Sequence, residues 1–137
     1  MYHYRKTMQV YRRRKENPGC PFCNANTAAE SVRETKHLYV VPNLTQYDLW
    51  ELHKVTDHLL VVPKQHSEKL TELSSATRAD IMETLAEYEA RGYNIYGRAT
   101  TNARRSVAHQ HIHLIKTAGA QANGAVFLKK PYFLVTW

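Results

Sequence analysis

Apolar residues gather in short runs separated by polar turns, and three of these runs predict β-strands. Residues 37–42 are β-branched and aromatic in their middle and end at a proline. Residues 57–66 contain a continuous apolar run that ends at Pro63, which is typical of a buried central strand. Residues 93–98 predict a further strand. Residues 43–56 have no clean period, so we expect a connection with about one helical turn there.

One stretch has the 3–4 spacing of an amphipathic helix. Ser74 or Ser75 can cap its beginning, and Gly92 ends it after Arg91. We expect this main helix to cover one face of the sheet. Its apolar stripe consists of Ile81, Met82, Leu85 and Tyr88.

The last part of the chain predicts one more strand and a hairpin. A polar connection, residues 100–105, leads into residues 106–115, where three histidines lie among apolar residues. Small residues then form a loop over 118–124. Residues 127–128 and 132–137 are predicted to pair around a Lys-Lys-Pro turn.

The length of 137 residues and the 43% apolar content fit one folded domain. We predict a basic N-terminal arm in residues 1–17 and a single domain in residues 18–137, without an internal repeat. We find no apolar run of about 18 residues and no secretory leader, so we expect neither a membrane span nor export. The expected location is cytoplasmic.

The net charge of +7 attracts polyanions, nucleotides included. Much of the excess lies in the arm, which carries Arg5, Lys6, Arg12, Arg13, Arg14 and Lys15. The simplest interpretation is a solvated arm. The alternative is weak contact with RNA or DNA, because the tyrosines at positions 2, 4 and 11 can stack on bases.

The segment 106–115 places His109, His111 and His113 at i, i+2 and i+4. In a strand all three imidazoles would project from one face, whereas a helix would bring only the first and last together. A fortuitous His-rich strand or an adventitious metal site is the alternative to a functional cluster.

Cys20 and Cys23 form a Cys-x-x-Cys pair after a turn and a charged arm. The pair is typical either of a redox dithiol or of half a zinc site, and a redox dithiol would be expected between a strand and a helix. We therefore favour zinc, which needs two further ligands from the chain's histidines.

The segment His109-Gln110-His111-Ile112-His113, with Ser106 three positions before it, resembles the signature of the histidine triad (HIT) superfamily. His58, followed by four apolar residues and Pro63-Lys64-Gln65-His66, resembles a second landmark of that family. The resemblance, over residues 20 to about 116, implies an α+β fold: an antiparallel sheet of about five strands with one main helix packed across it. It also implies a homodimer.

In that family the middle histidine attacks the α-phosphate of a nucleotide and forms a covalent nucleotidyl-histidine. The resemblance therefore implies a nucleotide hydrolase or nucleotidyl transferase, of the phosphoramidase or dinucleoside polyphosphate hydrolase type. His111 matches the nucleophile, and His113 and Ser106 match positions that contact the phosphate or assist the leaving group. A histidine at the third position favours hydrolysis over hexose-phosphate transfer.

The resemblance also assigns metal and substrate ligands. Cys20, Cys23, His66 and His109 match four ligands of a structural zinc. His58 matches a supporting histidine. The expected substrate-binding residues are His58, Asn43, Asn102 and Arg105.

The chain departs from the family at several positions. Residues 102–106 form a shortened phosphate loop with arginines in place of glycines, Asp57 replaces the usual glycine before His58, and Gln110 replaces an apolar residue. These changes bear on the substrate more than on the reaction class. The alternative function is a zinc-stabilised nucleic-acid-binding module that uses the basic arm and turns nothing over.

Overall fold

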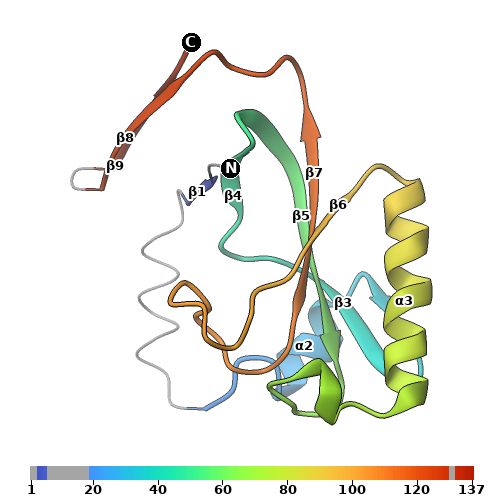
Figure 1. Ribbon diagram of the computed structural model, residues 1–137. Helices are drawn as coiled ribbons and strands as arrows, with labels where there is room; N and C mark the ends of the chain where they lie inside the picture. The colour runs from blue at the N-terminus through green and yellow to red at the C-terminus, as the bar shows by residue number, and fades with distance from the viewer. Residues whose placement is uncertain (1–2, 6–18, 130–131) are drawn as a thin grey trace.

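The computed structural model describes residues 3–5, 19–129 and 132–137 (Figure 1). Most of the predicted basic arm lies outside these residues. The elements, in chain order, are β1 (His3–Arg5), α2 (Ala25–Glu30), β2 (Arg33–Glu34), β3 (Leu38–Pro42), β4 (Tyr47–Trp50), β5 (His53–Pro63), the 3₁₀ turn η1 (Leu70–Glu72), α3 (Ser75–Ala90), β6 (Asn94–Tyr96), β7 (Ile112–Ala118), β8 (Ala125–Lys129) and β9 (Tyr132–Thr136).

A seven-stranded antiparallel sheet is built around β5. β3 and β4 pair with successive parts of one edge of β5, and β7 pairs with the other edge. β6 extends the sheet beyond β7, while β2 and β1 extend it beyond β3 and β4. The predicted α+β architecture is confirmed, and the sheet is larger than the expected five strands.

The β4–β5 hairpin corrects the expectation of an irregular connection over residues 43–56. Trp50 pairs with His53, which leaves a two-residue turn of Glu51 and Leu52. Both residues have positive φ, 51° and 64°, as in a type I′ turn. Such turns match the twist of the paired strands, so the hairpin forms although neither turn residue is Gly or Asn.

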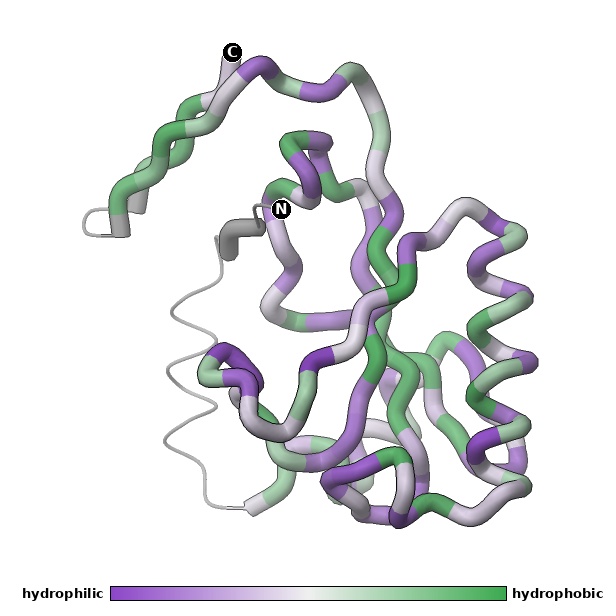
Figure 2. Tube along the Cα trace, in the orientation of Figure 1, coloured by the Kyte–Doolittle hydropathy of each residue, from purple (hydrophilic) through white to green (hydrophobic). Residues whose placement is uncertain are grey.

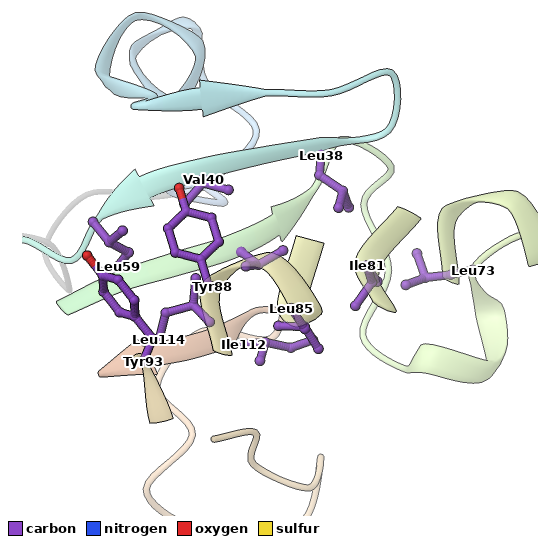
Figure 3. Close-up of a cluster of buried hydrophobic side chains, with 11 residues drawn as sticks. Leu38, Val40, Leu59, Leu73, Ile81, Leu85, Tyr88, Tyr93, Ile112 and Leu114 are labelled. Carbon is purple, nitrogen blue, oxygen red and sulfur yellow. The ribbon is translucent and has the colours of Figure 1, made fainter. Parts of the chain in front are cut away.

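The core lies between α3 and one face of the sheet (Figure 3). Because side chains alternate along a strand, Leu59 and Val61 of β5 and Leu114 of β7 point to this face. The helix contributes Ile81, Leu85 and Tyr88, as its stripe predicts. Met82, assigned to the same stripe, is instead 65% exposed.

The predicted ends of the helix are confirmed. The Ser74 hydroxyl accepts a hydrogen bond from the Thr77 N–H, and α3 runs from Ser75 to Ala90. Gly92 follows with φ 86°, a left-handed conformation that costs glycine little.

The triad segment is only partly a strand. β7 begins at Ile112, so His113 alone of the three histidines lies on it, and His109 and His111 precede it in irregular chain. The Gln110 N–H donates to the Ser67 carbonyl instead of to a sheet neighbour. The strand geometry predicted for all three histidines is therefore wrong, although, as described below, their rings still gather.

The predicted C-terminal hairpin is confirmed, and β8 and β9 form a separate two-stranded sheet. It extends away from the main sheet and is largely apolar (Figure 2). Val126 and Val135 pair across it and are 51% and 42% exposed.

Candidate active site and metal centre

The histidines gather on the face of the sheet opposite α3. His58 and Leu60 alternate with the core residue Leu59 along β5, and His113 of β7 pairs directly with Leu60. His58 and His113 are both buried. Alternation along two neighbouring strands therefore separates the catalytic candidates from the helix-covered core.

Four predicted metal ligands converge on one point. Cys20, Cys23, His66 and His109 each offer one ligand atom, and these atoms lie within 4.8 Å of one another. Cys23 Sγ is 3.1 Å from His66 Nδ1, and both thiols are 3.4 Å from His109 Nδ1. The segments that carry the ligands are far apart in the sequence, so the cluster is a tertiary feature.

The cluster fits a tetrahedral metal ion. Zinc–sulfur and zinc–nitrogen bonds of usual length place sulfur and nitrogen about 3.5 Å apart around the ion. The His109 Nε2–H donates to the Pro63 carbonyl at 2.8 Å, which leaves Nδ1 with the lone pair that a metal needs. Burial lowers the pKa of His109, and this also favours the neutral, ligating ring.

His111 is held in one tautomer by the chain beside it. Its Nδ1–H donates to the His109 carbonyl at 2.8 Å, so Nε2 carries the lone pair. The ring is 9% exposed, and burial, followed by the nearby charges of Arg105 and Arg98, lowers its pKa to about 4. The imidazole is therefore neutral at neutral pH.

His113 lies against both neighbouring histidines. Its ring centroid is 5.2 Å from that of His111 and 5.2 Å from that of His58. Nδ1 of His113 is 2.9 Å from Nε2 of His58.

Asn43 has a supporting position. Its Oδ1 accepts from the Thr45 N–H and hydroxyl, each at 3.0 Å, and its amide nitrogen lies beside the His58 ring. The side chain is buried. Among the predicted substrate-binding residues, Asn43 is thus next to the histidine network.

The shortened loop is braced by Arg105. Its guanidinium donates to the carbonyls of Glu68 and Ala108, each at 2.6 Å, and to Gln110 Oε1 at 3.2 Å. Asn102 Oδ1 accepts from the Arg104 N–H, which closes a turn. Gln110, the other departure in this segment, is therefore part of the brace.

The structure also places Asp57, which stands where the family has glycine, and Ser106, a predicted catalytic residue. Asp57 Oδ1 accepts from the His58 N–H at 2.9 Å, and its other oxygen accepts from the Tyr93 hydroxyl. Asp57 thus ties β5 to the segment after α3. Ser106 has an exposed side chain in the loop before the triad.

A cavity of about 370 Å³ lies between α2, the Cys20–Cys23 segment and the sheet. Phe22, Val41, Leu44 and Leu60 give it apolar walls, and Asn24, Asn26, Thr27 and Glu30 add polar groups. The Phe22 ring lies 5.4 Å from that of His111, so one wall borders the histidines. The size suits a small ligand.

Sequence reasoning missed the cavity and two residues beside His113, Tyr47 and Arg98. Phe22, which lines the cavity, could have been found from its place between the two cysteines. Tyr47 lay in the segment whose strand was missed, and Arg98 followed a predicted strand without a motif of its own.

Comparison with known proteins matches part of the chain to a domain family and its fold to solved structures. Residues 53–119 match the HIT domain family model. A HIT family protein from Bacillus anthracis str. 'Ames Ancestor' has a similar structure, with TM-score 0.58, 23% identity, and coverage of 82% of this chain and 83% of that chain. A search of curated proteins found no match.

Two other solved structures show the same fold. A HIT family hydrolase from Legionella pneumophila Philadelphia 1 has TM-score 0.52 and 20% identity, and covers 77% of this chain and 96% of that one. A histidine triad nucleotide-binding protein from Candida albicans has TM-score 0.54 and 21% identity, covering 80% and 83%. Residues 53–119 therefore resemble the HIT domain, and the chain has the fold of these histidine triad proteins.

Within the described part of the chain, no helix has the length and apolar character needed to cross a bilayer.

Proposed function

We propose that this protein is a nucleotide hydrolase or nucleotidyl transferase that works through a covalent intermediate on His111. The observation that carries the proposal is the single tautomer of His111, whose Nδ1–H is held by the His109 carbonyl. A neutral imidazole with a free Nε2 lone pair is a nucleophile at neutral pH. The family match and the names of the hydrolase and nucleotide-binding neighbours support the same class.

In the first step His111 Nε2 attacks the α-phosphorus. A phosphorus–nitrogen bond forms while the bond from phosphorus to the leaving group breaks, and the leaving group departs with that electron pair and takes up a proton. In the second step water attacks phosphorus, loses its proton, and releases His111 as the neutral ring. An acceptor hydroxyl in place of water would give nucleotidyl transfer. Two steps with one nucleophile divide a difficult displacement into easier ones.

The cavity beside Phe22 supports a nucleoside as the group attached to the phosphate. Its apolar walls can cover a base, while the polar side chains of α2 at its edge can hydrogen-bond to base or ribose. Phe22 lines this cavity, and its ring centroid is 5.4 Å from that of His111. A nucleoside there would bring its 5′-phosphate to the histidines.

We propose zinc as the ion held by Cys20, Cys23, His66 and His109, with a structural role. When bound, zinc supplies a rigid crosslink between the Cys20–Cys23 segment and the triad segment. His109 contributes to both features, since its ring faces the cluster and its carbonyl holds His111. The cluster thereby orients the nucleophile without entering the reaction.

Replacement of the nucleophile tests the proposal. We expect His111→Asn to lower turnover by several orders of magnitude, because loss of a nucleophile removes the whole covalent route. Nucleotide affinity should remain, as a polar side chain of similar size fills the place. Wild-type enzyme quenched in mid-reaction should carry an acid-labile nucleotide adduct, and the variant none.

The substrates for this assay are nucleoside phosphoramidates and dinucleoside polyphosphates. His53→Asn is the matched control, because His53 lies on the β4–β5 hairpin and bonds only to the Glu51 carbonyl among the described contacts. Near-normal turnover in His111→Asn would show that the covalent mechanism is wrong.

A further inference from the structure

The cavity beside Phe22 lies across the sheet, and the strand order gives its direction. On the face opposite α3, His113 of β7 pairs with Leu60 of β5, and Leu60 pairs with Val41 of β3. Leu60 and Val41 both line the cavity. β2 follows β3 in the sheet, so this row runs from the triad strand outwards to β2. Three strand spacings of about 4.8 Å separate its two ends, which is about 14 Å.

Glu30 lies at the outer end of this row. It is the last residue of α2, and two residues later the Val32 N–H donates to the Val40 carbonyl of β3 at 2.8 Å. Glu30 lines the cavity together with Pro42, the last residue of β3. Among the described residues that line the cavity, it is the only Asp, Glu, Lys or Arg. The cavity therefore borders imidazoles at one end and carries a carboxylate at the other.

Two polar side chains of α2 can serve a ligand in this cavity. Asn24 and Thr27 are used within the chain, since Asn24 Oδ1 accepts from the Thr27 N–H at 3.2 Å and the Thr27 hydroxyl donates to the Pro21 carbonyl at 3.3 Å. Within the described part of the chain, the side chains of Asn26 and Glu30 make no hydrogen bond or ion pair. They are four residues apart on α2, so they lie on one face of the helix. Both can therefore act on one ligand.

The chemistry of a carboxylate selects among nucleobases. A carboxylate only accepts hydrogen bonds, so its two oxygens match an edge with two neighbouring donors. Guanine alone of the four common bases has such an edge, formed by its ring N1–H and its 2-amino group. Adenine and cytosine place a ring lone pair beside their amino group, and uracil places a single N–H between two carbonyls. The 6-oxygen of guanine, on the other side of N1–H, accepts from an amide such as that of Asn26.

We infer that Glu30 is a specificity-determining residue that selects guanine nucleotides, with Asn26 as a donor to the 6-oxygen. The inference rests on the proposed function and names the base of its substrate. The separation of about 14 Å across the strands is comparable to the length of an extended purine nucleotide bound to a histidine. It also keeps the carboxylate away from the phosphate, because charges are screened over about 8 Å at physiological ionic strength.

The first test needs no variant. Calorimetry measures the affinity of the full-length wild-type protein for guanosine, inosine and adenosine 5′-monophosphates. The guanosine nucleotide should bind most tightly and the adenosine nucleotide about tenfold or more weakly, as expected for one charge-assisted hydrogen bond. The inosine nucleotide should be intermediate, because it keeps N1–H and lacks the 2-amino group. Equal affinities for all three would overturn the inference and leave Glu30 as a solvated side chain.

Glu30→Gln tests the residue itself. A glutamine amide presents one donor and one acceptor, which match the N1 lone pair and the amino group of adenine. Binding of the guanosine nucleotide should weaken about tenfold, whereas binding of the adenosine nucleotide should stay the same or tighten. Glu83→Gln, which removes an exposed carboxylate on α3, is the matched control and should keep the wild-type ratio. An unchanged ratio in folded Glu30→Gln, or equal weakening of both nucleotides, would overturn the inference.

These measurements separate base selection from the covalent mechanism. They are equilibrium affinities and need no nucleophile, so they can be repeated in His111→Asn. If His111→Asn turns over normally while wild type prefers guanine, the mechanism fails and base selection stands. If the His111 adduct forms equally from guanine and adenine substrates and Glu30→Gln changes nothing, base selection fails and the proposed function stands.

Discussion

The three histidines of one short segment differ in the hydrogen-bond partners of their ring nitrogens. His109 donates from Nε2 to a carbonyl and offers Nδ1 to the metal cluster. His111 donates from Nδ1 to the His109 carbonyl, which leaves the lone pair on Nε2. His113 Nδ1 lies 2.9 Å from His58 Nε2, within hydrogen-bond distance. Residue type alone does not determine the tautomer, because either nitrogen of a neutral imidazole can carry the proton. A hydrogen-bond partner determines which one does.

His113 should therefore be important but replaceable. We expect His113→Ala to lower turnover by about 10²-fold, the usual effect of losing a positioned polar side chain, while leaving the nucleophile in place. The acid-labile adduct on His111 should still be detectable by mass spectrometry after an acid-free quench. His53→Asn, on the β4–β5 hairpin, is again the control. Absence of adduct in a folded His113→Ala protein would mean that His113 itself takes part in bond formation to phosphorus.

The sequence predicted the residues with distinctive chemistry better than those that surround them. The Cys-x-x-Cys pair and the family resemblance together named four metal-ligand candidates, and the structure brings all four together. Arg98 and Tyr47 carry no such signal, because an arginine after a strand and a tyrosine in a mixed segment are ordinary on a protein surface. Their position beside His113 comes from strand pairing between β6, β7, β4 and β5, which a single sequence does not display.

Element by element, strong periodicity gave reliable predictions. The stripe of α3, its serine cap and its terminal glycine all act locally, and the helix appears where they place it. The β4–β5 hairpin was missed because Glu51-Leu52 lacks the usual turn residues. The start of β7 was predicted too early because the triad alternates like a strand. The Gln110 N–H instead bonds to the Ser67 carbonyl, so this part of the chain does not pair with a sheet neighbour.

The unusual turn gives a stability prediction. Leu52 has φ 64°, a conformation that costs a branched residue about 1 kcal/mol more than glycine. Leu52→Gly should therefore raise the free energy of unfolding by about 0.5–1 kcal/mol, offset in part by the larger entropy of the unfolded chain. Gly92→Ala, at φ 86° after α3, should change stability by a similar amount in the opposite direction. Urea unfolding followed by circular dichroism measures both. Destabilisation by Leu52→Gly would show that the Leu52 side chain contributes more through packing than it costs in backbone strain.

On the scale of the whole molecule, the two faces of the sheet are stabilised in different ways. One face is covered by α3 over a continuous apolar core that includes the fully buried Leu38, Val40, Val61 and Leu114 (Figure 3). The other face carries a smaller cluster of Phe22, Val41, Leu60 and Val62, next to buried imidazoles. Polar groups replace apolar contacts there, so a crosslink between distant segments adds what packing alone does not supply.

A metal ion held by Cys20, Cys23, His66 and His109 would make that crosslink between distant segments of the chain. We therefore expect about one zinc per chain in protein purified without added metal, measured by mass spectrometry of the metal content. Removal by chelation should lower the free energy of unfolding by at least about 2 kcal/mol, because the ion binds the folded chain in preference to the unfolded one.

Substitution separates the role of the ion from that of the side chains. Cys23→Ser should lose the metal, and its free energy of unfolding should fall by as much as chelation lowers that of wild type. A chelator should then have no further effect on the variant. His37→Gln, a histidine on the approach to β3 and outside the cluster, should retain both metal and stability. Turnover in the metal-free protein should fall, because the His111 Nδ1–H is held by the carbonyl of His109, a proposed metal ligand. The proton NMR signal of this Nδ1–H should weaken at the same time. Wild-type metal content close to zero in a fully stable protein would contradict a structural zinc and leave the four residues as an unmetallated cluster.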